Sequence, residues 1–328
     1  MFSVHRLDGS QGLRREKLRN LRDYVKDCCG NGEAVNIGRA AFTTSLNLMS
    51  ATLFSKEFAR LGSADSSQEF RDVVCGIMSL ICKPNLADYF PLLRLVDPHG
   101  IFRENTVYFK KCFAIFDEII RQRQQTSDSY TPKNDMLEAL LQINQKNESE
   151  FSLNDIKHLL LDLFVAGTDT TSSTVEWAMT ELLRNPEKMS KARNELRNVA
   201  GQKEKIQESD ISRLPYLRAV VKETFRLHPA APLLAYGRSL MYSCPERFLE
   251  TETDVHGQHF ELLPFGGRRI CVGLPLAYRM VHLMLATLIS SFDWKLEEGL
   301  KAEEVDMDER FGLTLQKAIP LMAVPTQL

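Results

Sequence analysis

Apolar residues recur at helical spacing over most of the chain, and this pattern predicts a mainly α protein with a small β part. The predicted helices lie near residues 10–30, 34–60, 66–83, 99–124, 133–147, 153–185, 187–200, 214–228 and 273–291. Apolar and polar residues alternate only towards the C-terminus, where we expect strands over 292–296, 313–315 and 319–325. The 328 residues can bury one large core, so we expect a single domain over residues 1–328.

The longest predicted helix, 153–185, has an irregular centre. Residues 152–155 (Ser-Leu-Asn-Asp) form a capping-box pattern at its start, and Asn-Pro at 185–186 ends it. Gly167 and the threonines around it are poor helix formers, and a local rule broken inside an element suggests function. Gly167 would let a flat ligand approach the backbone, while Asp169 and Thr170 supply an acid and a hydroxyl. The alternative is a Ser/Thr-rich turn whose hydroxyls bond back to preceding carbonyls.

A glycine-rich turn leads into the last predicted helix and places Cys271 near the helix entrance. Unpaired backbone N–H groups and the positive end of the helix dipole favour a thiolate there. The glycines let a flat group approach the backbone, and Arg268 and Arg269 could pair with its carboxylates. This combination suits a single thiolate that holds a haem iron. The alternative is an inert, half-buried thiol, since free cysteine usually packs as a small apolar residue.

Two charged motifs lie between these segments. Glu223 and Arg226 are three residues apart on a predicted helix, so both side chains project from one face and can pair. Arg247, within residues 245–248 (Pro-Glu-Arg-Phe), could complete a cluster of one glutamate and two arginines. Each motif alone is also typical of ordinary surface ion pairs.

Taken in order along the chain, these four motifs resemble those of the cytochrome P-450 haem-thiolate monooxygenases. Residues 42–47 (Phe-Thr-Thr-Ser-Leu-Asn), 85–91 (Asn-Leu-Ala-Asp-Tyr-Phe-Pro) and 260–266 (Phe-Glu-Leu-Leu-Pro-Phe-Gly) are similar to the plant subgroup of geraniol-hydroxylase-like and flavonoid-hydroxylase-like enzymes. The resemblance covers nearly the whole chain. It implies a mainly α cytochrome P-450 fold with a small residual β part.

The resemblance also implies that the chain binds haem b (iron protoporphyrin IX). Cys271 would be the axial thiolate ligand of the iron, and Arg269 would bond a haem propionate. Phe265 and Gly273 would belong to the same cofactor-binding turn.

Residues away from the turn take further roles from the resemblance. Thr170 would hold dioxygen and its water, and Asp169 would help to deliver protons. Ala166 and Gly167 would leave room for oxygen and substrate. A buried ion-pair cluster would lock the core behind the haem, and its members would be Glu223, Arg226 and Arg247.

The implied activity is insertion of one oxygen atom from O2 into a small lipophilic substrate of monoterpenol or phenolic type. No phosphate-cradling glycine loop occurs in the sequence, so electrons from NADPH would arrive through a separate NADPH-cytochrome reductase. Family members lie on the cytosolic face of the endoplasmic reticulum membrane, but we expect this chain to lack the anchor and to be cytosolic. Phe164, Leu233 and Leu234 are expected to line the substrate pocket or to belong to the core.

Three departures from the family pattern bear on activity. Only five residues separate Phe265 from Cys271, so the turn is one residue short, and Val272 stands where plant members usually have proline. Residues Leu233–Cys244 fill an interval that holds several dozen residues in the family, including strands beside the pocket. The first residues read like the family's chain just after the helix with the Trp-x-x-x-Arg haem contact, so we expect a shortened chain.

These departures favour a second hypothesis, a catalytically inactive truncated remnant with weak or no haem binding. A third hypothesis is a haem-thiolate isomerase or dehydratase that needs no reductase. The oxygen-handling pair Asp169 and Thr170 argues against the third.

Composition changes this picture by exclusion. The net charge of −2 gives no electrostatic reason to bind nucleic acid. Basic residues between positions 6 and 26 alternate with acidic ones, as on a solvated helix face. The seven cysteines show no Cys-x-x-Cys spacing, which argues against a zinc site and a disulfide framework, and for a reducing compartment. His256 and His259 lie in a loop with no third ligand, so we expect no metal there. No stretch approaches eighteen consecutive apolar residues.

Overall fold

The computed structural model describes residues 4–58, 61, 66–81, 83–125, 135–146, 151–201, 206–231, 242–256, 258–259, 262–266, 269–297, 300–310 and 312–328. Backbone contacts divide the chain into two compact units, Met1–Ser45 with Gly167–Leu328, and Leu46–Ala166. Two helices, α3 (Ile37–Phe54) and α8 (Leu153–Arg184), contribute residues to both units. A single domain over residues 1–328 stays a prediction.

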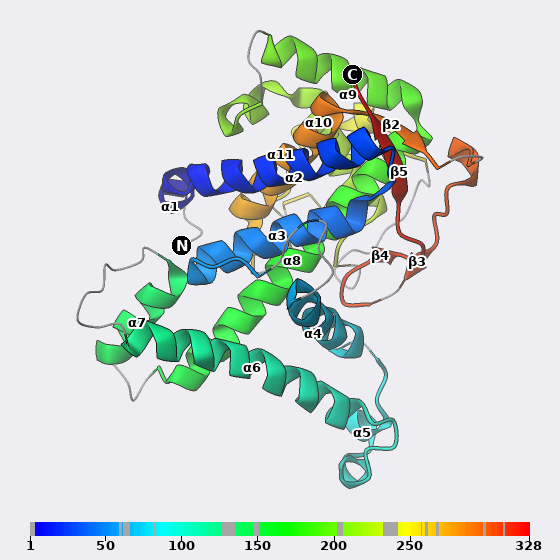
Figure 1. Cartoon of the computed structure of the whole chain (residues 1–328). Coiled ribbons are helices and arrows are strands. Elements are labelled where there is room, and N and C mark those ends of the chain that lie inside the picture. Colours follow the sequence, from blue (N-terminus) through cyan, green and yellow to red (C-terminus); the bar gives the residue numbers. More distant parts are fainter. Residues whose placement is uncertain are drawn as a thin grey trace. The chain divides into compact units, whose positions relative to one another are not determined.

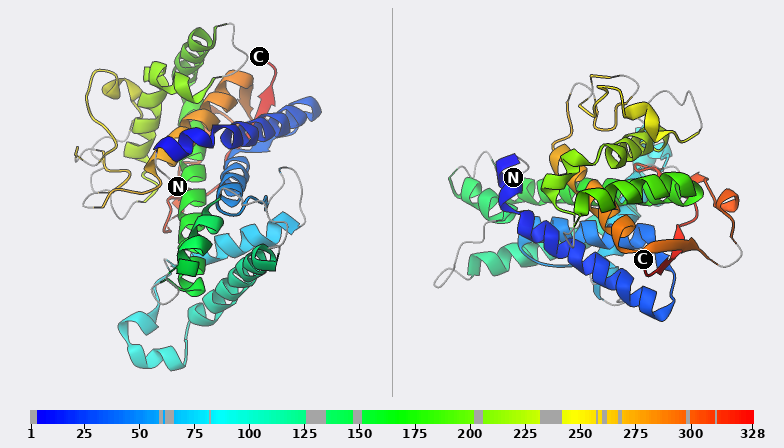
Figure 2. Two further views of the ribbon diagram at one scale, coloured as in Figure 1. Left: turned by 90° about the vertical axis from the view of Figure 1, so that its left-hand side faces the viewer. Right: turned by 90° about the horizontal axis from the view of Figure 1, so that it is seen from above.

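Helices make up most of the first unit and meet around α11 (Figures 1 and 2). Besides parts of α3 and α8, its described helices are α1 (Val4–Gly9), α2 (Gln11–Asn31), α9 (Pro186–Ala200), α10 (Pro215–Leu227) and α11 (Leu274–Ser291), with 3-10 segments η2 (Glu208–Arg213), η4 (Pro245–Phe248) and η5 (Ala302–Glu304). The apolar helix α11 contacts α2, α9 and α10. Its residues Met284, Leu285 and Ile289 are fully buried, so this helix forms the centre of the core.

Among the described helices, α11 alone has the length and apolarity to cross a membrane. However, 61% of its 18-residue window is buried inside the protein, as expected for a helix in a protein core.

The strands form two small antiparallel sheets within the described residues. One sheet has the order β1-β5-β2, from β1 (Val35–Asn36), β5 (Met322–Thr326) and β2 (Asp293–Leu296). The other pairs β3 (Glu309–Arg310) with β4 (Gln316–Lys317), and Arg310 lies opposite Gln316. The prediction of a mainly α protein with a small β part is confirmed. The strand predicted over 313–315 is wrong, because β4 starts only at Gln316.

The second unit is helical within its described residues. Its elements are α4 (Ser66–Ile81), α5 (Leu86–Tyr89), η1 (Pro91–Leu95), α6 (Ile101–Gln125) and α7 (Met136–Lys146), with parts of α3 and α8. Helices α4 and α6 pack closely at Gly76, where an added Cβ would lie 2.5 Å from the Tyr108 ring. The ring of Phe164 lies 6.3 Å from that of Phe54, and both side chains are fully buried. Phe164 therefore belongs to an aromatic core.

Local sequence signals explain where α8 starts and stops. Asp155 N–H donates to the Ser152 hydroxyl over 3.2 Å, and Ser152 N–H donates to the Asp155 carboxylate over 2.9 Å, so the predicted capping box is confirmed. The helix ends at Arg184, one residue before Asn185-Pro186, as predicted. Proline cannot supply the N–H that a continuing helix would need.

Candidate functional site

The threonine-rich centre of α8 is helical, and two of its threonine hydroxyls bond back to helix carbonyls. The hydroxyls of Thr171 and Thr174 donate to the carbonyl oxygens of Gly167 and Thr170 over 3.1 and 2.9 Å. The back-bonding alternative therefore holds for these two residues. Ala166 is exposed and Gly167 and Thr170 are half-buried, so this stretch is less covered than residues 171–183 of the same helix, which are all buried.

Asp169 lies on the buried side of the same helix, with 3% of its surface exposed. Its Oδ1 accepts a hydrogen bond of 2.7 Å from the Gln316 amide. Burial raises the pKa of the Asp169 carboxyl above its ordinary value, while the hydroxyl of Thr314, the amide of Gln316 and the charge of Arg310 oppose this rise. Its Oδ2 has no partner with hydrogen-bond geometry among the described residues. This carboxyl can therefore hold or release a proton inside the protein.

The cysteine turn, from Phe265 to Cys271, precedes α11. Cys271 is exposed, and its N–H donates to the carbonyl of Phe265 over 3.0 Å, which closes the turn. Gly266 has φ +90, in the left-handed region that favours glycine, so the tight reversal depends on this residue. Arg269 is exposed and Gly273 caps the helix. Arg268 lies outside the described residues.

The donor set fits a haem group. An accessible thiol stands two residues before the helix cap, and thiolate sulfur is a known axial ligand of haem iron. Ala166 and Gly167 on α8 carry the smallest side chains and leave their helix surface without bulk. The ring of Phe265 lies edge-on to Phe225 of α10, with centroids 5.2 Å apart, and this contact anchors the turn to the core.

Glu223, Arg226 and Arg247 are brought together by α10 and η4. Arg226 donates two hydrogen bonds of 2.8 Å to the two carboxylate oxygens of Glu223. Arg247 Nε lies 3.2 Å from Glu223 Oε2, and the N–H of Cys244 donates to Oε1 over 2.7 Å. Glu223 is 1% exposed, so one buried carboxylate connects α10 to the segment around η4.

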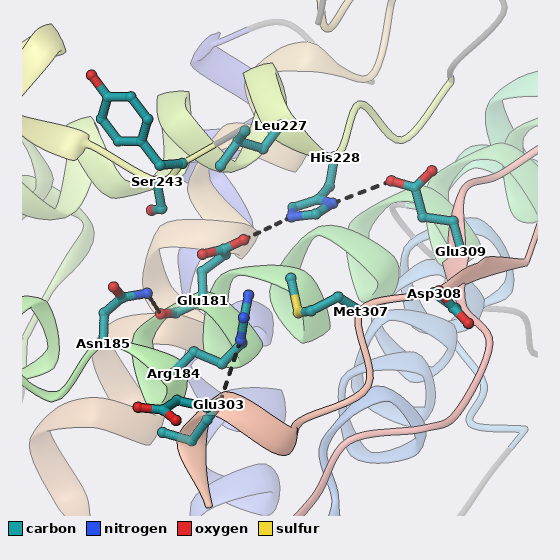
Figure 3. A pocket seen from close by; sticks show the side chains of 12 residues that line it. Glu181, Arg184, Asn185, Leu227, His228, Ser243, Glu303, Met307, Asp308 and Glu309 are labelled. Carbon is teal, nitrogen blue, oxygen red and sulfur yellow. Dashed lines mark hydrogen bonds and ion pairs between the residues drawn. The ribbon is translucent and has the colours of Figure 1, made fainter. Parts of the chain in front are cut away.

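A polar pocket of about 560 Å³ lies beside this cluster and was not predicted from the sequence. Figure 3 shows the imidazole of His228 between the carboxylates of Glu181 and Glu309. Its nitrogens lie 2.9 Å from Glu181 Oε1 and 3.5 Å from Glu309 Oε1. The ring stacks on Trp177 with centroids 3.9 Å apart. These contacts connect the end of α10 to α8 and β3, so His228 stabilises the fold.

The sequence contained no signal for Gln316 as a partner of Asp169. The two residues are far apart in the chain, and β4 has only two residues, too few for an alternating pattern. The predicted pocket residues Leu233 and Leu234 lie outside the described residues.

Comparison with known proteins shows where the chain has relatives. The family model described as Cytochrome P450 matches residues 10–240 and 244–322. The protein named Cytochrome P450 76T24 from Catharanthus roseus is 54% identical over 365 aligned positions, which cover 100% of this chain and 73% of that protein. Geraniol 8-hydroxylase from the same plant is 47% identical, with the same two coverages. Drimenol monooxygenase from Persicaria hydropiper is 46% identical, over 100% of this chain and 72% of that enzyme.

The alignments also locate a difference in length. The first relative is aligned over 365 positions and this chain has 328 residues, so that relative carries residues that have no counterpart here. The family match is interrupted at residues 241–243, inside the interval Leu233–Cys244 where the sequence predicts missing residues.

Proposed function

Since the chain belongs to the cytochrome P450 family, we propose that it is a haem-thiolate monooxygenase that inserts one oxygen atom of O2 into a small lipophilic substrate. The observation that carries this proposal is the exposed Cys271 at the entrance to α11, in a turn closed by its own N–H. When bound, haem b supplies the activation of O2 with electrons from outside the protein.

We assign the binding of haem to the cysteine turn. Cys271 would provide the thiolate sulfur that binds the haem iron, and the exposed Arg269 would pair with a propionate. Phe265 holds the turn against α10 and Gly273 caps α11, so both residues keep the sulfur at the helix entrance. The Glu223, Arg226 and Arg247 cluster keeps α10 and η4 in place and touches no substrate.

We assign the handling of oxygen and protons to the centre of α8. Thr170 lies half-buried on α8, one turn after the small residues Ala166 and Gly167, which would leave room for oxygen and substrate. Asp169 stores a proton on its buried carboxyl and passes it through water towards Thr170. Burial raises the pKa of this carboxyl, so Asp169 keeps its proton to a higher pH than an exposed aspartate does, which suits a proton donor.

The names of the relatives guide the choice of substrate class. Geraniol 8-hydroxylase and drimenol monooxygenase are named after small terpenoid alcohols. We propose a monoterpenol or a phenolic compound of similar size. Electrons from NADPH come through an NADPH-cytochrome reductase, and the working site is the cytosolic face of the endoplasmic reticulum membrane.

One observation favours a second candidate, an inactive remnant. The family match is interrupted at residues 241–243, the turn before Cys271 is one residue short, and the apolar residues Ile270 and Val272 on either side of the cysteine are exposed. A missing wall would leave haem without enough contacts to be retained.

The carbon monoxide difference spectrum of the reduced, haem-reconstituted chain separates the two candidates. A thiolate-ligated haem gives a strongly red-shifted band, and we expect Cys271→Ala to abolish it while the control Cys29→Ala, at a half-buried free cysteine on α2, retains it. Absence of haem uptake by the correctly folded chain would establish the remnant. A red-shifted band that survives Cys271→Ala would remove Cys271 from its assigned role.

Replacement of Thr170 tests the oxygen-handling assignment separately. We expect Thr170→Ala to keep the red-shifted band but to lower product formation by on the order of 10²-fold, while NADPH is still consumed. The matched control is Thr174→Ala, one turn later on α8, whose hydroxyl bonds to the Thr170 carbonyl. Unchanged product per NADPH in Thr170→Ala would contradict the assignment.

A further inference from the structure

One face of α8 is bonded to the segment that contains β4 and β5. The Trp177 indole N–H donates to the carbonyl of Leu315 over 3.2 Å, and the Ser173 hydroxyl donates to the same oxygen. Between these two residues, the Glu176 carboxylate accepts the N–H of Leu321 over 2.9 Å. Ser173, Glu176 and Trp177 are all buried and recur at helical spacing, so the C-terminal segment has a fixed register on α8.

This register brings Gln316 to the buried carboxyl of Asp169. Asp169 lies one turn before Ser173 on the same face of α8, and Gln316 directly follows Leu315. The Gln316 Nε2 donates to Asp169 Oδ1 over 2.7 Å. The contact between Gln316 and Asp169 therefore follows from the way the segment that contains β4 and β5 docks on α8, and not from the side-chain rotamer of Gln316 alone.

Arg310 fixes which way the Gln316 amide faces. Arg310 lies opposite Gln316 in the β3–β4 ladder, and its guanidinium donates to Gln316 Oε1. A guanidinium has donors only, so it binds the amide oxygen and turns the NH2 group towards Asp169. The exposed Arg310 thus orients, through Gln316, a part-buried hydrogen bond to Asp169.

We infer that Gln316 is a positioning residue, which holds Oδ1 of Asp169 so that Oδ2 remains free to exchange a proton, while Arg310 keeps the Gln316 amide in the donating orientation. The inference rests on the proposed function of Asp169 as the proton donor of the site. It adds two residues outside α8 to the machinery, although neither touches oxygen or substrate.

The inference predicts in which direction the protonation of Asp169 changes when the Gln316 amide is removed. The amide NH2 group stabilises the ionised carboxylate, because a neutral carboxylic acid would also need an acceptor for its own proton. Loss of this donor leaves Oδ1 buried without a partner and favours the protonated acid. Gln316→Met keeps most of the side-chain volume and removes only the amide.

The first test needs no haem. Isotope-edited infrared spectra of the haem-free chain, with labelled aspartate, follow the carboxyl band that Asp169→Asn removes. We expect Gln316→Met to shift the titration of this band to higher pH, and Arg310→Met to shift it in the same direction by less. Gln142→Met is the matched control, because Gln142 also donates to a carboxylate, Glu138, but on an exposed surface. A midpoint that does not move in either variant would overturn the inference.

The second test uses the haem-loaded enzyme with its reductase. We expect Gln316→Met to lower product per NADPH by about tenfold, because a positioned proton donor contributes on the order of 10²-fold or more, with little change in KM. The double variant Asp169→Asn/Gln316→Met should lose no more than Asp169→Asn alone. Additive losses would overturn the inference.

The two tests distinguish a failure of the proposed role of Asp169 from a failure of the positioning inference. If Asp169→Asn leaves product per NADPH unchanged, the proposed role of Asp169 fails, whatever the infrared titration shows. If Asp169→Asn is uncoupled but Gln316→Met and Arg310→Met behave as wild type, only the positioning inference fails. Arg310 is exposed, so its variant should fold even if Gln316→Met does not.

Discussion

The imidazole of His282 is one of the most buried titratable groups of the described residues, with 1% of its surface exposed. Its Nδ1 lies 2.6 Å from the carbonyl oxygen of Tyr278, one turn earlier in α11. Burial lowers the pKa of His282 from 6.5 to about 4, since no carboxylate compensates the charged form and Arg218 adds a like charge. The side chain therefore stays neutral in the folded protein at neutral pH.

This lowered pKa makes stability depend on pH. Between pH 6.5 and about 4, His282 is protonated in the unfolded chain but neutral in the folded protein. The free energy of unfolding therefore decreases as the pH falls through this range. The loss over this range is about 3 kcal/mol. We expect His282→Gln to remove that part of the slope, measured by urea unfolding at several pH values.

A matched control exists in α8. His158 makes the same contact with a carbonyl four residues earlier, Asn154, over 2.8 Å, but it is exposed. His158→Gln should leave the slope as in the wild type. An unchanged slope in His282→Gln would contradict the burial argument.

At the scale of elements, the carboxylate of Glu223 connects α10 to η4. The Arg226 side chain is 8% exposed, so removal of Glu223 would leave a buried guanidinium without its counter-charge. We expect Glu223→Ala to lower the free energy of unfolding by about 3–5 kcal/mol. Lys191→Ala, which breaks the exposed pair of Lys191 with Glu246, should change stability little. Equal effects of the two variants in urea unfolding would contradict a buried structural cluster.

The sequence predicted long elements well and short ones poorly. Helices α8, α9, α10 and α11 were predicted to within about two residues, because a capping box, a proline or a glycine marks their ends. Strands β3 and β4 have two residues each, and no pattern can specify a strand of that length. Residues 313–315 were predicted as a strand, but the carbonyl of Leu315 bonds to α8 instead of to a neighbouring strand.

The candidate site was predictable only where its residues belong to motifs. Asp169, Thr170, Glu223, Arg226 and Cys271 stand in recognisable local patterns. Gln316, Arg310 and His228 act through contacts made across the fold, and a single sequence contains no record of such distances. For this reason the sequence indicated Asp169 as a candidate residue but not Gln316, whose amide donates a hydrogen bond to it.

At the scale of the molecule, the second unit has a surface with several exposed apolar side chains along α5, η1 and the start of α6. Its most exposed members are Tyr89 (73%), Leu92 (84%), Leu95 (91%) and Phe102 (66%). Exposed apolar side chains that gather on one surface favour association in water. These side chains make few contacts with the core, so their replacement should not weaken the fold.

We expect Leu92→Gln/Leu95→Gln to reduce self-association, measured by light scattering at several protein concentrations, while the unfolding midpoint in urea stays the same. Ile319→Gln is the control, because Ile319 is 59% exposed but lies outside this surface. Equal reduction by the control would mean that total apolar exposure, and not this surface, causes association.

The packing around Trp177 gives the chain an optical signal of its own. The indole is stacked on His228, and the ammonium group of Lys317 lies 4.7 Å from its ring centroid. Imidazole and ammonium groups this close to an excited indole quench its emission. His228 stays beside the indole only while the end of α10 is in place, and Lys317 only while the β3–β4 pair is in place. Since the chain has two tryptophans, a Trp294→Phe background would isolate the Trp177 emission. Loosening of the β3–β4 pair would then increase the fluorescence of Trp177, and no ligand, label or substrate would be needed to detect it.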